Sequence, residues 1–447
     1  MIKSNIKRLM MTAALCAATL GATAQNGFNV PFSQFGIGSS ELPFNLPLVS
    51  RMGGTVYTTA GNNFVNPFNP ASYGSIELES FVFDMGVGIQ MSTLRDNNEK
   101  LFDADGNLGY LLMAMPLTQW WKLAAGLMPY TTVDYESVAL QSDPTYPGGT
   151  VKTVYGGTGG VNEVLLGTAF NILRGKGMKP SLQVGVNAYY LTGKIERSIA
   201  YTFLGNDTTY FVNSSRYKKT TVSNLVFDAG VQYRQPLGAK SVLTVGAVYK
   251  PYLDMKVKDL AMIYTQVGNS LLDTVFPAAG DDPEFESRLE RPQTVGVGVS
   301  LEVDKRWRMA VDATFASWQG MKYTEGQEPS IMGSSVVRYD QCNRYALGLE
   351  RMGNMDAQSY WGRISWSCGA HLTQGALRLN IAGTDHTLGE WGLGAGATLP
   401  MRKGKSLLTL SVGYTSLGSR DVLQRNTMTF GIAVSSCEHW FFKRKYN

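Results

Sequence analysis

The sequence predicts an all-β fold, a transmembrane antiparallel β-barrel of about fourteen strands with an N-terminal hatch inside its lumen. Apolar residues recur on every second position, the connections between these stretches alternate in length, and an irregular segment precedes the first stretch. Alternation of this kind is the period of a strand with one apolar face. In a membrane barrel that face meets lipid, and small or polar residues line the interior.

The hairpin at residues 290–318 shows the repeating unit most clearly. Its apolar residues alternate with small or polar ones such as Gly296 and Ser300. We expect a tight loop centred on Asp304, because the chain must reverse there. The predicted register puts the apolar side chains on one face through these pairs: Leu301 with Trp307, Val299 with Met309, and Val297 with Val311.

The same alternation recurs along the chain and predicts the remaining strands. The predicted strands are 81–89, 108–117, 123–135, 161–172, 182–195, 225–233, 243–249, 295–301, 307–315, 336–350, 360–372, 391–399, 407–414 and 428–434. Every second connection is short, namely 118–121, 173–179, 235–240, 303–306, 351–358 and 400–405. The others are longer, which is typical of a barrel with one periplasmic rim and one outer rim.

The N-terminus reads as a secretory signal. Lys3, Lys7 and Arg8 precede the apolar stretch 9–20, and Ala22-Thr23-Ala24 is a small-x-small cleavage site. We therefore divide the chain into a signal peptide (1–24), an N-terminal hatch or plug (25–75) and a transmembrane β-barrel (76–447). An exported barrel predicts an integral protein of the bacterial outer membrane.

Charge and cysteine content exclude other classes. The net charge of +5 falls to +2 when the three basic residues of the signal are removed, which gives no basis for binding nucleic acid. Cys342, Cys368 and Cys437 remain in the exported chain, and an odd number is no disulfide framework. Alternation puts Cys342 on the polar face and Cys368 on the apolar face, so we expect no bridge between them.

Glycines gather on the predicted inner face. Two interpretations stay open: sites where the barrel bends, or a lumen that leaves room for a folded segment. The irregular stretch 25–74 is the obvious occupant. The glycines are Gly86, Gly88, Gly185, Gly230, Gly246, Gly296, Gly298, Gly348, Gly394, Gly396, Gly413 and Gly431.

Several motifs resemble the outer-membrane long-chain fatty acid and hydrophobic-compound transporter family (FadL/TodX-type). Gly27-Phe28-Asn29 and Phe35-Gly36-Ile37-Gly38 are similar to the start of that family's hatch, and Asn69-Pro70-Ala71 to its end. Gly126-Leu127-Met128-Pro129-Tyr130 is similar to the third strand's glycine–proline segment. Residues 291–296 and 344–348 resemble later strands of the family.

The resemblance implies uptake of a hydrophobic molecule through outer-loop capture, a lumen pocket and sideways exit through the wall. Gly126 and Pro129 would form the gate together with Asn69, Pro70 and Ala71. Proline lacks the N–H that a barrel ladder needs, so Pro129 would interrupt the wall. Its neighbours Met128 and Tyr130 point inward by alternation and are candidate ligand contacts; a harmless kink near a rim is the alternative.

Two further sets of residues are candidate ligand contacts. The long connection 254–288 carries Leu260, Ile263, Tyr264, Val267 and Leu271 at helical spacing, which predicts a short amphipathic helix with an apolar stripe. The stripe would capture ligand or pack on neighbouring loops. Phe28, Phe32 and Phe35 of the hatch would wall the lumen pocket or pack the plug.

The sequence gives little sign of chemistry, and we expect no enzyme, cofactor or metal. The histidines are His371, His386 and His439, and no nucleophile elbow or phosphate loop occurs. A hydrolase built on His371 is a minor alternative. Asp103-Ala104-Asp105-Gly106-Asn107 hints at calcium but lacks the downstream glutamate, so we interpret it as a plain turn.

Three functions remain in competition. The first is a plugged barrel that imports hydrophobic small molecules such as fatty acids, acting as a monomer whose other partner is outer-membrane lipid. The second is a non-transporting scaffold of a protein secretion or surface complex. The third is an open diffusion pore, which predicts steady ion conductance.

Overall fold

The computed structural model describes residues 31–34, 46–95, 100–142, 149–175, 179–204, 212–267, 270–276, 284–318, 323–324, 337–339, 341–381, 384–401, 405–420 and 423–439. The predicted signal peptide, Phe28 and Phe35 lie outside these ranges. No helix within them is long and apolar enough to cross a membrane.

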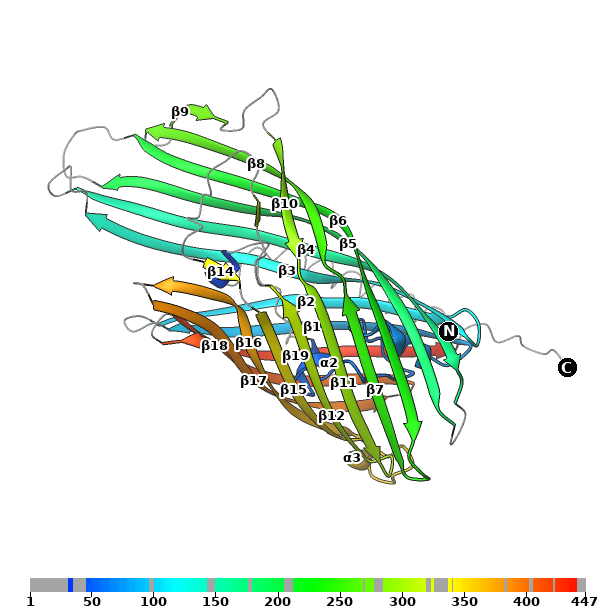
Figure 1. The fold of residues 1–447 in the computed structure, drawn as a ribbon. Coiled ribbons are helices and arrows are strands. Elements are labelled where there is room, and N and C mark those ends of the chain that lie inside the picture. Colours follow the sequence, from blue (N-terminus) through cyan, green and yellow to red (C-terminus); the bar gives the residue numbers. More distant parts are fainter. Residues whose placement is uncertain are drawn as a thin grey trace, which may run out of the picture.

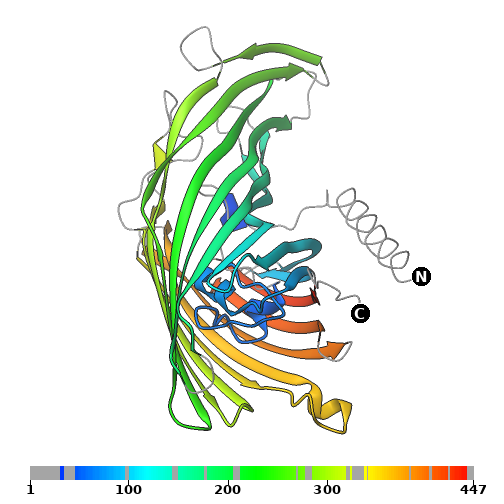
Figure 2. The same ribbon diagram turned by 90° about the vertical axis from the view of Figure 1, so that its right-hand side faces the viewer.

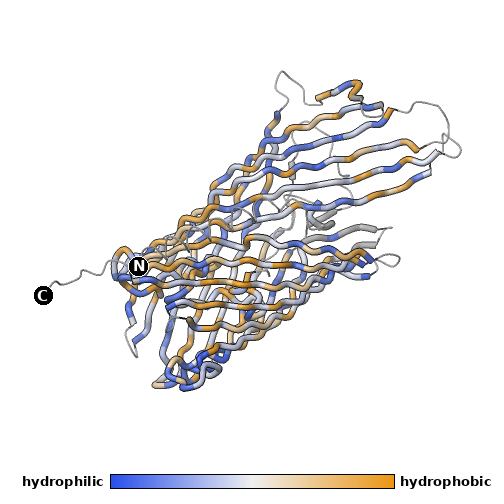
Figure 3. The backbone as a smooth tube through the Cα atoms, turned by 180° about the vertical axis from the view of Figure 1, so that it is seen from behind, coloured by the Kyte–Doolittle hydropathy of each residue, from blue (hydrophilic) through white to orange (hydrophobic). Residues whose placement is uncertain are grey.

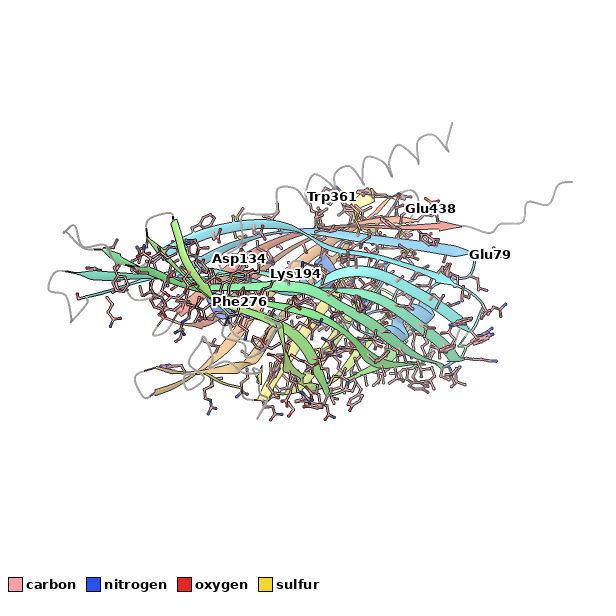
Figure 4. The ribbon with its side chains drawn as sticks, turned by 90° about the horizontal axis from the view of Figure 1, so that it is seen from above. Glu79, Asp134, Lys194, Phe276, Trp361 and Glu438 are labelled. Atoms are coloured by element: carbon pink, nitrogen blue, oxygen red, sulfur yellow. The ribbon has the colours of Figure 1, made fainter. Side chains whose placement is uncertain are left out.

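In the described part of the chain, fourteen antiparallel strands close a barrel (Figure 1). The ring is closed where the first strand, β1 (Ser80–Arg95), pairs along its whole length with the last, β19 (Leu423–His439). Glu79 and Glu438, beside the first rungs of that ladder, lie at one end of the molecule, and Asp134 lies toward the other (Figure 4). The predicted barrel class is confirmed.

Some strands of the barrel continue as a second, collinear piece. β7 (Ser241–Lys250) and β8 (Leu253–Val267) both pair with β6, and β10 (Glu284–Arg291) continues as β11 (Gln293–Val303). The other strands are β2 (Lys100–Pro116), β3 (Trp121–Ser142), β4 (Thr150–Leu173), β5 (Ser181–Leu204), β6 (Asn213–Pro236), β9 (Ser270–Val275), β12 (Trp307–Ser317), β13 (Tyr323–Thr324), β14 (Val337–Tyr339), β15 (Gln341–Arg351), β16 (Ser365–Ile381), β17 (Thr384–Met401) and β18 (Ser406–Ser419). The helices among the described residues are all short: η1 (Pro31–Gln34), α2 (Pro47–Ser50), η2 (Pro70–Ser75) and α3 (Tyr360–Arg363).

The outer surface carries the alternation that the sequence predicts. Apolar and polar residues alternate along the strands (Figure 3). In the hairpin of β11 and β12, Val297, Val299, Met309 and Val311 are 42 to 54% exposed, while Ala310 and Asp312 are buried. An outward band of large apolar side chains on a closed barrel is the surface that meets lipid, so this face is the membrane face.

The register of the same hairpin was predicted wrongly by two residues. Val303 pairs with Trp307, Leu301 with Met309 and Val299 with Val311. Asp304 and Lys305 adopt positive φ angles of 53° and 54°, which make the loop tighter than expected. A shift of two residues leaves every side chain on the same face of the sheet. The predicted faces are therefore correct, although the predicted residue pairs are not.

Strands extend far into stretches that were predicted as long loops. β4, β5 and β6 each have 24 residues, whereas about 9 to 11 suffice to cross a membrane. Most of 95–106, 137–157, 196–217 and 373–390 is therefore strand, and the strands β3 to β6 and β8 project well beyond the barrel's closed part (Figure 1). The prediction from sequence places the end of each strand where its outward apolar residues end. That position marks the edge of the membrane, and the strand continues beyond it.

The residues 46–76, here called the inner segment, lie inside the curve of the strands (Figure 2). One end of the segment, α2, contacts β17, β18 and β19. The other end, η2, contacts β3, β4, β5 and β6. The segment therefore crosses the lumen from one wall to the opposite one.

The described cysteines form no bridge, as predicted. Cys342 is half-buried, Cys368 is exposed and Cys437 is buried, and all three are free thiols.

Candidate functional site

The ladder between β2 and β3 ends early. Its last pair is Leu111 with Leu127, although β2 reaches back to Lys100 and β3 runs on to Ser142. Among the described strands, the remainder of β2 pairs only with β1, and the remainder of β3 only with β4. The wall parts along this line, which we call the seam.

A β-bulge on each side turns the two strands apart. The register of β2 with β1 skips Gly109, and the register of β3 with β4 skips Tyr130. Pro129 stands directly before the second bulge and has no N–H to offer a neighbour. Bulges bend a strand and interrupt its ladder. The glycine–proline segment noted in the sequence therefore lies where the wall divides, with Gly126 still in close contact with Leu111 and Leu112 of β2.

The seam begins where the outer surface of β3 and β4 changes from apolar to polar. Leu127 and Val164 are paired, and they are 43% and 44% exposed. The next exposed positions along these strands are polar, for example Asn162 and Thr132, and exposed apolar residues return only toward the end of β3, at Val138 and Leu140. The seam thus opens at the outer edge of the apolar band and continues beyond it.

One residue of the N-terminal region holds the free edge of β3. Ser33 in η1 is buried, and its Oγ accepts a hydrogen bond of 3.1 Å from the backbone N–H of Asp134. This backbone group faces the seam, because β4 occupies the other edge. Phe32, a predicted pocket residue, belongs to the same short helix.

The inner face of β3 to β8 is apolar, and we call it the apolar wall. These side chains are buried while their neighbours along each strand face outward; for example, Leu165 is 1% exposed and Leu166 is 63% exposed. They form one hydrophobic cluster that includes Met128, Val133, Tyr135, Val161, Leu165, Tyr189, Leu191, Ile195, Val222, Val226, Val248, Met255 and Val257. Tyr130 packs against this cluster. The structure thus places both predicted neighbours of Pro129 on the lumen side.

The sequence contained a signal for the apolar wall that simple alternation missed. Runs of consecutive apolar residues mark strands buried on both faces. Such runs occur at 164–166, 189–191 and 225–227, and pairing brings them side by side: Leu165 lies opposite Tyr189, which lies opposite Val226.

A small set of charged residues borders the apolar wall near the seam, and we call it the polar cluster. Arg291 donates to Asp228 Oδ1 at 2.7 Å, and Lys250 Nζ lies 3.4 Å from Asp228 Oδ2. Glu163, opposite Met128 in the ladder, lies within electrostatic reach of all three. Tyr130 interacts with Arg291. The cluster joins β3, β4, β6, β7 and β10.

The opposite side of the lumen is polar, and we call it the polar wall. His371 Nε2 lies 2.9 Å from Glu390 Oε1, and Arg344 and Arg425 act electrostatically on the same carboxylate. Ser92 and Thr427 share a 2.7 Å hydrogen bond between β1 and β19. The buried residues of this wall are mainly hydroxyl-bearing or charged: Arg344, Ser367, His371, Ser411, Thr415, Ser416, Arg425, Thr427 and Thr429.

Buried hydrogen bonds fix the inner segment to the barrel. Asp312 Oδ2 accepts from the backbone N–H groups of Val56 and Tyr57 at 2.6 and 2.9 Å. The hydroxyl of Tyr57 bonds Thr314 Oγ1 at 2.7 Å, and burial raises its pKa to about 12, so the phenol stays neutral. Arg51 pairs with Glu350 at 2.6 Å. Charged and neutral contacts therefore hold the segment on several strands.

The predicted hatch motif takes part in this attachment. Asn69 accepts from the N–H of Ala71 and donates to the carbonyls of Tyr57 and Val231, the latter on β6. Pro70 begins η2 and lies against Gly185 and Gly230.

Glycines of the barrel mark where the inner segment approaches the wall. A Cβ added at Gly394 would overlap the carbonyl oxygen of Ser50, and one at Gly369 would overlap the backbone of Met52. The glycines in such contact are Gly185, Gly230, Gly246, Gly296, Gly298, Gly348, Gly369, Gly394 and Gly396. At these positions the lumen leaves room for a folded segment.

The predicted amphipathic helix in 254–288 is wrong. Leu260, Ile263, Tyr264 and Val267 belong to β8, and Leu271 belongs to β9. On a strand, Ile263 faces the opposite side from Leu260 and Tyr264, so the stripe divides between two faces. Pairing of β8 with β6 and β10 overrides the local helical spacing.

Two smaller sequence interpretations also change. Residues 103–107 lie within β2, so they are not a turn, and no group of metal-ligating side chains was found among the described residues. Residues 360–363 form α3 and not the start of a strand.

A cavity of 240 Å³ lies at the end of the barrel with the short connections. The inner segment, α3 and the strands β1, β2, β12 and β15 to β19 contribute to its lining. Its charged groups are Arg51, Asp84, Arg308, Glu350 and Arg363.

Solved structures with the same architecture are described as a transporter, a channel and a FadL homologue. The toluene transporter TodX of Pseudomonas putida is 15% identical, with a TM-score of 0.52 over 88% of this chain and 98% of that one. The CymD monoaromatic hydrocarbon channel is 14% identical, with a TM-score of 0.51 over 89% and 100%. A FadL homologue of Pseudomonas aeruginosa is 12% identical, with a TM-score of 0.51 over 88% and 100%. At these identities the likeness shows the fold.

The closed ring, the apolar outer face and the occupied lumen define an integral β-barrel of the outer membrane. The FadL/TodX-type fold expected from the sequence motifs is confirmed. The chain belongs to the BamG family, whose sequence model it matches over residues 1–447. No curated protein matches the chain in sequence.

Proposed function

We propose that the protein is an outer-membrane channel for the uptake of hydrophobic small molecules, a class that includes long-chain fatty acids and hydrocarbons. The main support for this proposal is the seam, which opens directly beside the buried apolar wall. A molecule leaving that wall through the seam would reach the outer edge of the apolar band. The channel descriptions of TodX and CymD, which share the fold, support the same function.

The proposed path has three stages. The outer ends of β8 and β9 would capture the molecule, since Leu271, Leu272 and Val275 are 52 to 59% exposed there. The apolar wall, with Met128 and Tyr130, would hold it. The gap beside Pro129 would release it sideways. Residues 25–75 would act as the hatch, with Asn69, Pro70 and Ala71 at its attached end.

Replacing Pro129 with alanine tests the seam. Alanine restores a backbone N–H and permits the ladder with β2 to extend beyond Leu127, so uptake of a tritiated hydrophobic probe by cells should fall severalfold. Pro236→Ala is the control, because Pro236 is a strand proline at the end of β6, where the short connection to β7 begins. Equal uptake by wild type and Pro129→Ala would reject lateral exit.

A non-transporting scaffold is the second candidate, and the rigid attachment of the inner segment favours it. Asp312, Glu350 and Asn69 hold the segment through buried contacts, as expected of a plug that does not move. Native mass spectrometry of protein extracted from outer membranes separates the two. A stoichiometric protein partner with no bound hydrophobic molecule supports the scaffold, and a bound hydrophobic molecule supports the channel.

A further inference from the structure

We propose that the lumen selects uncharged hydrophobic molecules over carboxylates, and that Asp228 determines this selectivity. The inference rests on the proposed channel function and narrows its ligand class. Its basis is the charge balance of the polar cluster, since that cluster is the polar boundary of the apolar wall.

The cations of the polar cluster are already engaged. Arg291 is 5% exposed, and its guanidinium donates to Asp228 Oδ1 at 2.7 Å and to the carbonyl of Phe227 at 3.4 Å. Lys250 lies 3.4 Å from the other oxygen of the same carboxylate. A ligand carboxylate would have to displace Asp228 to reach Arg291, leaving a buried carboxylate without its partner.

A second acid strengthens the exclusion. Glu163 faces the lumen, because its neighbours Asn162 and Val164 are exposed on the outer side. It lies within electrostatic reach of Asp228 as well as of the two cations. Two carboxylates therefore balance two cations, and a third negative charge would meet like charge in a poorly hydrated space.

The polar wall offers no better site for an anion. Arg344 and Arg425 both interact with Glu390, which also contacts His371. An uncharged hydroxyl, by contrast, disturbs none of these charged groups and finds Tyr130 beside the apolar wall. The chemistry favours an alkane, an aromatic hydrocarbon or an alcohol.

Hexadecanol and palmitate test the inference, because they share a chain length and differ in the charge of the headgroup. Full-length protein in detergent micelles is incubated with an equimolar mixture, and native mass spectrometry measures the ratio of the two bound forms. We expect hexadecanol to exceed palmitate by about tenfold, which corresponds to about 1.4 kcal/mol of discrimination.

Asp228→Asn should shift that ratio toward palmitate by about tenfold, because Arg291 and Lys250 then lack their carboxylate while the asparagine still accepts a hydrogen bond. Glu163→Gln, which removes the other acid, should shift the ratio in the same direction. Asp254→Asn is the matched control, since Asp254 pairs with Arg288 at 2.9 Å on the exposed side of β8. Heat-dependent mobility on gels shows that each variant barrel has folded.

The outcomes separate the two proposals. Palmitate bound as well as hexadecanol by wild type, or an unchanged ratio in both folded variants, would overturn the selectivity while leaving the channel intact. Binding of neither probe would reject the channel, and this inference with it.

Discussion

The two walls of the lumen come from the same kind of strand yet carry opposite chemistry. The apolar wall presents Leu165, Leu191 and Ile195, each at most 1% exposed, whereas the polar wall presents His371, Arg425 and Thr427. Both walls show the same apolar alternation on their outer side. The membrane therefore determines the residues on one face of a barrel strand, and the contents of the lumen determine those on the other.

The inner segment contacts both walls with different partners. Its α2 end meets the polar wall near glycines, and its η2 end meets the apolar wall near Asn187, whose side chain accepts from the Tyr73 hydroxyl at 3.0 Å. The inner segment therefore packs against both walls.

Shortening a buried side chain of the apolar wall should cause the largest loss in the free energy of unfolding. Leu165→Ala deletes a side chain that is 1% exposed, and the remaining cavity should lower the free energy of unfolding by about 3 kcal/mol. Leu166→Ala, on the next residue and facing lipid, should cost clearly less. Urea unfolding followed by tryptophan fluorescence measures both. Equal losses would contradict the assignment of an inner apolar face.

Adding a methyl group where the polar wall contacts the inner segment should cause the second-largest loss of stability. A methyl group at Gly394 would overlap the carbonyl of Ser50, so Gly394→Ala should cost about 2 kcal/mol and expose α2 to protease. Gly389→Ala on the same strand meets only Thr373 O at 3.7 Å and serves as the control. Identical protease patterns in the two variants would show that α2 does not pack there.

Weakening the charged group of the polar wall should have a smaller effect. Glu390→Gln keeps an acceptor for His371 but removes the charge beside Arg344 and Arg425, so we expect a loss of about 1.5 kcal/mol. Glu286→Gln breaks an exposed pair with Lys256 and should change little. The urea midpoints of the two variants measure the two losses of stability. A larger loss in Glu286→Gln than in Glu390→Gln would contradict this ranking.

The smallest expected effect concerns a single hydroxyl pair of the polar wall. Thr427→Val removes the 2.7 Å hydrogen bond to Ser92 and should cost about 1 kcal/mol. Thr93→Val, one residue along β1 and on the outer face, is the comparison. The urea midpoint should fall for Thr427→Val and stay close to wild type for Thr93→Val.

The barrel class and the outer face could be predicted from the sequence, since residues such as Val297 and Met309 repeat at the period of a strand. The strand ends could not, because the pairing that carries β4 to Thr150 and β5 to Leu204 is a property of the folded sheet. The helix predicted from Leu260 and Ile263 was wrong for the same reason. Pairing with neighbouring strands outweighs a short stretch of helical spacing.

The candidate site was only partly predictable. Pro129, Met128 and Tyr130 were found because proline cannot take part in a ladder. Asp228, Arg291 and Lys250 were missed because each stands on a different strand, and no local spacing relates residues that only the closed sheet brings together.

The closing ladder between β1 and β19 has a consequence for assembly. The inner segment precedes β1 in the chain, and the ring that surrounds it is complete only when residues such as Ser80 and His439 have paired. Loop-closure entropy makes such a distant pairing a slow event. We therefore expect the segment to be seated before or during closure, because later entry would require the N-terminal part of the chain to thread a finished cylinder. In that order of events, the pairing of β19 with β1 seals an interior that is already filled.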